Sequence, residues 1–167
     1  MKNLILALFT SFMLMSFSGS NRPEHELHAM MVYNFIKYIE WPSSGQEFTI
    51  GVMGDVSVFN TLHQWYDGKL KGGKTLRVVM FKSISDVQKC NIIYMSNQSK
   101  EKLKSVIKIL EGKPTLLITN KPGFGQLGSG INFTVKDNKL RFELNEDAIK
   151  TAGLNVSSQL TAMAIVL

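Results

Sequence analysis

The chain has 167 residues, of which 44% are hydrophobic and 19% charged, and its 19 basic and 13 acidic residues give a formal net charge of +6. This length favours one domain with a proper core over two domains, and the apolar content argues against intrinsic disorder. The single cysteine, Cys90, excludes a disulfide within the chain, a zinc finger that needs several thiolates and a cysteine-ligated iron–sulfur cluster.

The N-terminus has the pattern of a secretory signal peptide. Lys2 precedes an apolar run from Leu4 to Phe17, and the small residues of Ser18–Ser20 follow it. The run of about fourteen residues is shorter than the roughly twenty that a membrane span needs, so cleavage is favoured over a membrane anchor. We therefore predict a signal peptide at residues 1–20 and a mature, exported domain at residues 21–167.

Helical and extended patterns alternate in the first half of the mature chain. A helix is expected over Glu24–Trp41, because apolar residues recur there at three- and four-residue steps, and Pro42 ends it. A strand follows at Phe48–Met53. After a turn at Gly54, Asp55 is placed to cap the next helix, so a strand, a turn and a helix follow in order.

The middle of the chain repeats this alternation. Leu76–Phe81 and Asn91–Met95 are rich in apolar residues and are expected to form buried strands. Ser99 can cap a helix whose C-terminal turn ends at Gly112, because its apolar residues form one stripe. Pro114–Thr119 then returns as a strand.

The C-terminal part adds an antiparallel hairpin. Apolar residues alternate at 131–135 and at 140–144, on either side of Asp137–Asn138, which tolerate the positive φ of a tight turn. Asn145 can cap a short helix that Gly153 closes. Periodic apolar residues predict a final helix, and they are Leu160, Met163, Ala164 and Leu167.

Together, these elements predict an α/β fold in a single domain. The expected sheet is mixed and mainly parallel, because strands alternate with helices, and helices cover both of its faces. The hairpin makes the C-terminal portion of the sheet antiparallel.

Two glycine-containing segments resemble nucleotide-binding motifs. Gly68–Thr75 has the spacing of a phosphate-binding loop, but such a loop leaves a strand and opens a helix, whereas here a helix precedes it and a strand follows. An exposed basic loop is therefore favoured over nucleotide binding. Gly51–Asp55 lacks the third glycine of a dinucleotide fingerprint, so a tight turn with a capping Asp55 is favoured over a ribose contact.

No arrangement of side chains in the sequence indicates catalysis. His25 and His28 do not form an HExxH motif, and solvated residues of a first helical turn are favoured over a metal site. Cys90 has no evident partner base and is interpreted as a packed thiol. The scattered lysines lack the interleaved aromatic residues of a single-strand binder. We therefore expect no catalytic residue, no metal, no cofactor and no nucleic-acid partner.

Several segments together resemble the YfiR family of exported bacterial regulators. They are Met31–Pro42, Gly51–Asp55, Gly123–Phe124 with Gly130–Phe133, Leu140–Asn145 and Ala152–Ser158. The resemblance covers nearly the whole mature chain and implies a YfiR-like α/β domain at residues 21–167 that resides in the periplasm. It also implies a non-enzymatic regulator that binds and restrains the periplasmic part of an inner-membrane signalling protein, such as a diguanylate cyclase of cyclic-di-GMP signalling or a sensor kinase.

Three residues are candidates for the surface that binds this partner. Phe124 could insert as an aromatic anchor from a flexible glycine-rich loop, and the segment from Asn145 to Ile149 follows a hairpin that would hold it rigidly. In the alternative, Phe124 folds back on the core and Ile149 is an ordinary buried helix residue. A homodimer stays open. The competing function is a periplasmic carrier with a small ligand near Gly54–Asp55, or a module that binds the cell wall.

The first prediction concerns export. Because the apolar run has the length and flanks of a signal peptide, N-terminal sequencing of the protein recovered from the periplasm should begin between Gly19 and Arg22. Recovery of a chain that still begins with Met1 from the membrane pellet would contradict this prediction.

Overall fold

The computed structural model describes residues 22–42 and 45–167, so the predicted signal peptide at residues 1–20 lies outside the described residues. None of the helices in this part of the chain has the length and apolar content that a membrane crossing requires.

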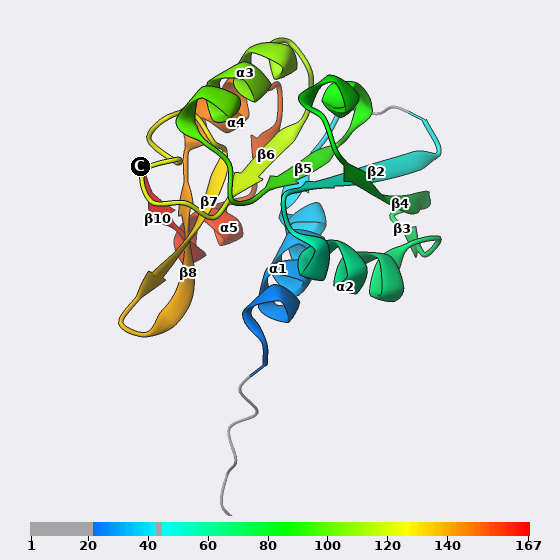
Figure 1. The fold of residues 1–167 in the computed structure, drawn as a ribbon, viewed down its shortest axis with the longest axis horizontal. Helices are drawn as coiled ribbons and strands as arrows, with labels where there is room; N and C mark the ends of the chain where they lie inside the picture. The colour runs from blue at the N-terminus through cyan, green and yellow to red at the C-terminus, as the bar shows by residue number, and fades with distance from the viewer. Residues whose placement is uncertain (1–21, 43–44) are drawn as a thin grey trace, which may run out of the picture.

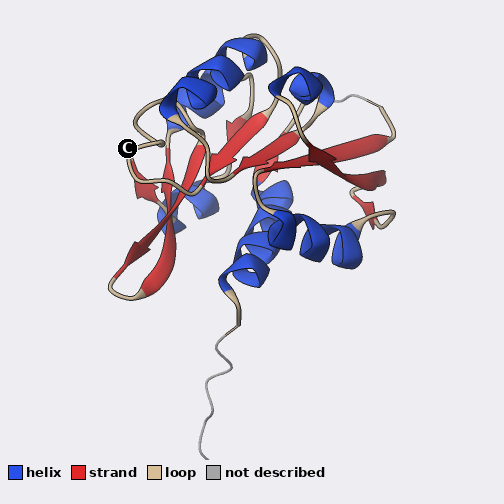
Figure 2. Ribbon diagram, in the orientation of Figure 1, coloured by secondary structure: helices blue, strands red, loops and turns tan. Residues whose placement is uncertain are grey.

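An eight-stranded mixed sheet forms the centre of the described domain (Figures 1 and 2). Its strands lie in the order β10-β8-β7-β6-β5-β2-β4-β3. The strands are β2 (Glu47–Met53), β3 (Leu70–Lys71), β4 (Lys74–Phe81), β5 (Ile92–Met95), β6 (Leu116–Thr119), β7 (Ile131–Lys136), β8 (Lys139–Leu144) and β10 (Ile165–Val166). Neighbours from β4 through β2, β5 and β6 to β7 are parallel, and β10 is parallel to β8. The hairpins β3–β4 and β7–β8 are antiparallel, so the predicted mixed, mainly parallel sheet is confirmed.

Helices cover both faces of the sheet (Figure 1). They are α1 (Glu24–Tyr38), α2 (Val56–Tyr66), the 3₁₀ helix η1 (Ile84–Lys89), α3 (Lys100–Leu110), α4 (Glu146–Thr151) and α5 (Ser158–Met163). The side chains of β5 alternate between two cores, because successive strand residues point to opposite faces. Ile92 and Tyr94 pack with α1 and α2, whereas Ile93 and Met95 pack with α3 and η1.

Most of the predicted local signals are present in the structure. The backbone N–H of Val58 donates to the Asp55 carboxylate at 3.0 Å, which caps α2 as expected. Ser99 caps α3 in the same way. Asp137 and Asn138 have φ angles of 52° and 55°, and this is the left-handed turn predicted between β7 and β8.

The first helix is shorter than predicted. Helix α1 ends at Tyr38 rather than Trp41, and Ile39–Glu40 forms strand β1, which pairs antiparallel with β9 (Asn155–Val156). Two physical causes act here. Pro42 disfavours helical backbone at the residue before it, and β9 supplies hydrogen-bond partners from a distant part of the chain.

The prediction of a final helix to Leu167 is also wrong at its end. Helix α5 stops at Met163, and β10 then pairs with β8, with Ile165 opposite Glu143. The backbone N–H of Leu167 donates to the carbonyl of Leu144 at 3.0 Å. Short apolar periodicity does not distinguish a helix from a strand, and the open edge of β8 decides between them here.

The segment that mimics a phosphate-binding loop has the predicted order of elements. Helix α2 precedes it, and Gly72 and Gly73 form the turn of the β3–β4 hairpin with φ angles of 58° and 78°. Strand β4 follows this segment instead of a helix. The segment therefore does not lead into the helix N-terminus whose backbone N–H groups bind phosphate in a true phosphate-binding loop.

The second prediction concerns nucleotide binding. Because the hairpin offers no helix N-terminus to a phosphate, calorimetric titration with ATP and magnesium should show no micromolar binding. Lys74→Ala should leave the titration unchanged. Micromolar binding that Lys74→Ala abolishes is the result that would contradict this expectation.

Candidate functional site

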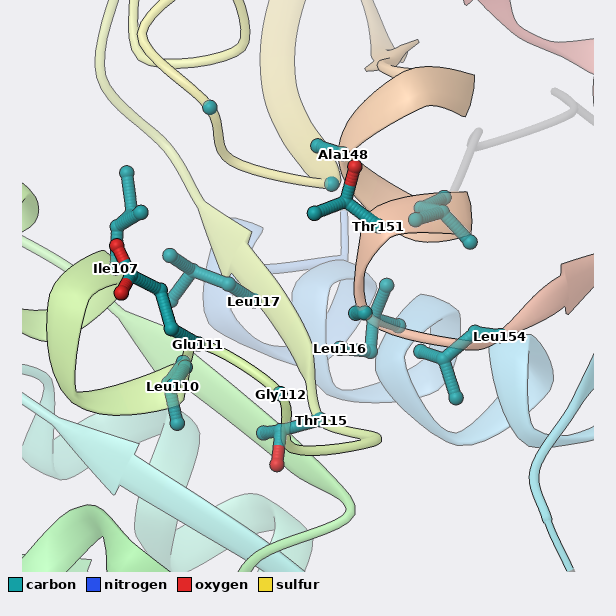
Figure 3. A pocket seen from close by; sticks show the side chains of 14 residues that line it. Ile107, Leu110, Glu111, Gly112, Thr115, Leu116, Leu117, Ala148, Thr151 and Leu154 are labelled. Carbon is teal, nitrogen blue, oxygen red and sulfur yellow. The ribbon is translucent and has the colours of Figure 1, made fainter.

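An apolar groove of about 280 Å³ lies between α3 and α4 at the amino end of β6. Figure 3 shows Ile107 and Leu110 on the α3 side, Ala148 and Thr151 on the α4 side, and the start of β6 between them. A concave, largely apolar surface of this kind is the usual form of a binding site. We call it the α3–α4 groove.

Two glycines set how closely the loop before β7 approaches this groove. A Cβ added to Gly130 would lie 3.0 Å from Cγ1 of Ile149 and 3.2 Å from Cδ1 of Leu116. Gly128 has a φ of 112°, and a Cβ there would lie 3.1 Å from Cδ1 of Ile107. A larger side chain at either position would therefore press into the groove or displace its walls.

The structure brings the three predicted partner-binding residues into one connected unit. The side-chain oxygen of Asn145 accepts a hydrogen bond from the N–H of Ala148 at 2.9 Å and so caps α4. Its side-chain nitrogen donates to the carbonyl of Gly125 at 2.9 Å, next to Phe124. Asn145 thus joins the glycine-rich loop to the helix that carries Ile149.

Phe124 and Ile149 are each only 2% exposed. Phe124 packs in the core under α3, and the Lys121 ammonium lies 5.4 Å from the centre of its ring. The expectation of an exposed aromatic anchor is therefore wrong, and the core alternative holds for this side chain. Ile149 is likewise buried, and it lines the α3–α4 groove.

The loop that carries Phe124 is held by hydrogen bonds rather than being a flexible connection. The N–H of Ser129 donates to the carbonyl of Phe124 at 3.1 Å. Behind it, the fully buried Asn132 accepts from the Thr119 hydroxyl at 2.7 Å and donates to Glu143 at 2.7 Å. Buried polar groups that are satisfied in this way fix the geometry of a loop.

Two exposed lysines lie on α3 beside the groove. Lys104 and Lys108 are within one helical turn of Ile107, which lines the groove, whereas Lys102 lines the cavity next to Gly54. Glu111 is the acidic residue among those that line the groove. An apolar segment whose acidic residues face Lys104 and Lys108 rather than Glu111 is complementary to this side of the site.

The prediction for Cys90 is confirmed, whereas that for His28 is wrong. Cys90 is buried, and burial raises the pKa of its thiol to about 12, so the group stays protonated at neutral pH, as expected of a packed thiol. His28 was expected to be solvated, but it is only 2% exposed. It pairs with Tyr94, which is 66 residues away in sequence, and no local pattern could have shown this.

Comparison with known proteins gives one family and a shared fold. The model of the YfiR/HmsC-like family matches residues 25–165. A search of curated proteins finds no match. Among solved structures, a conserved domain protein from Vibrio cholerae matches with a TM-score of 0.53 and 14% identity, over 86% of this chain and 60% of that one. This likeness is evidence of a common fold, and the present chain spans 60% of the length of that protein.

The third prediction concerns Asn145. Asn145→Ala removes the cap of α4 and the bond to Gly125, and it should lower the free energy of unfolding by about 1–2 kcal/mol. Urea denaturation measures this loss. Asp147→Ala, at an exposed position in the first turn of the same helix, is the control and should change it by less than about 0.5 kcal/mol. Equal effects of the two substitutions would contradict the role of Asn145.

Proposed function

The chain belongs to the YfiR/HmsC-like family, and we propose that it is a non-enzymatic periplasmic regulator that binds and restrains the periplasmic part of an inner-membrane signalling protein. The partner in this proposal is a diguanylate cyclase or a sensor kinase. The observation that carries the proposal is the α3–α4 groove, a concave apolar surface built on rigid elements.

The construction of the groove suits a protein partner. Its walls are helices, and the loop beside it is fixed by the bond from Asn145 to the carbonyl of Gly125 and by the bond from the N–H of Lys121 to the side-chain oxygen of Asn132. Binding to a surface that is already ordered avoids the entropy cost of fixing a loop. The exposed side chains at the rim, such as Thr151, surround buried apolar groups, such as Ile149 and Leu116. A polar rim around an apolar centre is the usual anatomy of an interface.

We infer the chemistry of the partner segment from the lining of the groove. An amphipathic helix or loop would place apolar side chains over Ile107, Leu110 and Ala148. Acidic residues beside them would face the lysines of α3, such as Lys104 and Lys108. Such charge pairs add specificity and speed association, while burial of the apolar side chains supplies most of the affinity.

A periplasmic ligand carrier is the second candidate, because a cavity of about 430 Å³ lies next to Gly54. Lys82, Gln98 and Lys102 line this cavity. It lies at the carboxyl ends of β2 and β4, where open α/β sheets bind ligands. Asp55 does not line it, since its carboxylate caps α2.

The fourth prediction tests the groove as the partner site. Thr151 is exposed and lines the groove, so Thr151→Trp should fill it without disturbing the core. Capture of the membrane partner after crosslinking should fall at least about tenfold, which corresponds to the loss of about 1.4 kcal/mol of binding energy. If the partner is a diguanylate cyclase, cellular cyclic-di-GMP should rise.

Lys150→Trp is the matched control, because this exposed residue of the same helix does not line the groove. It should retain partner capture, and both variants should keep the melting temperature of the unsubstituted protein. Undiminished capture by Thr151→Trp, or an equal loss in Lys150→Trp, would overturn the assignment of the groove.

A further inference from the structure

A second site lies at the opposite end of β6 from the α3–α4 groove, beneath the first turns of α1. His28 of α1 is 2% exposed, and its Nδ1 lies 2.9 Å from the hydroxyl oxygen of Tyr94 in β5. Its ring stacks on Phe133 of β7, with 4.4 Å between ring centres and an interplanar angle of 8°. The Tyr94 contact and the stacking together fix the orientation of the imidazole.

The other ring nitrogen of His28 has no hydrogen-bond partner. Among the described residues, the buried side-chain polar atoms without such a partner are Nε2 of His28 and Oγ of Ser96. Tyr94 lies in β5 and Ser96 directly follows that strand, so both unpartnered atoms lie near its carboxyl end. Buried polar groups are almost always paired, and an unpaired one calls for an explanation.

A cavity of about 290 Å³ opens beside His28. Pro122, Phe133, Val135 and Leu140 give it an apolar wall, and Asn120 and Thr134 add polar groups. Glu24 is the charged residue of its lining, and Oε1 of Glu24 lies 3.5 Å from Nε2 of His28. The cavity is therefore apolar along one side and carries a carboxylate next to an unpartnered nitrogen.

We propose that this cavity binds a small protonated amine with an apolar body. An ammonium group carries three donors and can bond to the Glu24 carboxylate and to Nε2 of His28 at the same time. The apolar body would contact Phe133, Val135 and Leu140. An anion of the same size would instead meet the negative charge of Glu24.

This role needs a neutral imidazole with its proton on Nδ1. Burial lowers the pKa of His28, so the ring is neutral at neutral pH. With the proton on Nδ1, that nitrogen donates to the Tyr94 oxygen, and Nε2 presents a lone pair as the acceptor. The competing arrangement places the proton on Nε2, from which it would point to Glu24 without any ligand.

Phenethylamine is the probe, because it combines an ammonium group with an aromatic body. Calorimetry should show saturable binding to the exported domain with a dissociation constant below about 1 mM. Phenylacetate, which has the opposite charge, should bind at least about tenfold more weakly. Glu24→Gln should weaken phenethylamine binding at least about tenfold. Glu26→Gln, in the same turn but outside the lining, should leave it unchanged.

Nitrogen NMR of the imidazole provides a second measurement. In the phenethylamine complex, the His28 proton should be on Nδ1, and the Nε2 resonance should shift on binding. Absence of saturable binding, equal binding of phenylacetate, undiminished binding by Glu24→Gln or a proton on Nε2 in the complex would each overturn the inference. Glu24 is absent from the lining of the α3–α4 groove, so partner capture by Glu24→Gln tests the proposed function separately.

Discussion

The parallel pairing of β2, β5 and β6 is the constraint on which the rest of the domain depends. β5 is buried at all four of its residues, because it lies between two strands and under helices on both faces. A strand buried on both faces must be apolar throughout and must alternate its side chains between two cores. Ile93 thus supports α3, whereas Tyr94 supports α1. The helices α1 and α3, which carry residues of the His28 cavity and of the α3–α4 groove, thus pack on opposite faces of this strand.

The extension of the sheet beyond β6 explains why the glycine-rich loop is ordered. β7 runs parallel to β6 and begins opposite Ile118, near the carboxyl end of β6, so the loop of residues 120–130 connects two strands at the same end of the sheet. Thr119 and Asn132 lie opposite each other at the base of this loop, and both are fully buried. Their hydrogen bond and the Asn132–Glu143 bond satisfy polar groups that would otherwise destabilise the core. The side-chain nitrogen of Asn145 donates to the carbonyl of Gly125 and so holds the loop against α4, and Asn145, the cap of that helix, begins one wall of the groove.

The sequence separation between two interacting residues decides whether their interaction can be predicted from the sequence. The caps of Asp55 and Asn145 and the turn at Asp137–Asn138 depend on residues only a few positions apart, and these predictions are confirmed. β10 and the burial of Phe124 depend on surfaces that exist only after distant segments pack. Of the candidate site, Asn145 and Ile149 could be predicted to lie together, because one helix carries both, but no periodicity indicates that α3 forms the other wall.

The His28 cavity and the α3–α4 groove lie at opposite ends of β6, and different residues line each of them. At the amino end of β6, Leu116 and Leu117 line the groove together with Glu111, and Lys104 and Lys108 are exposed nearby on α3. At the carboxyl end, Asn120 follows the strand and Glu24 adds negative charge. The two sites share none of their lining residues. An acidic protein segment of the kind proposed for the groove would meet the like charge of Glu24 at the His28 cavity, and this charge favours the proposed small cation there.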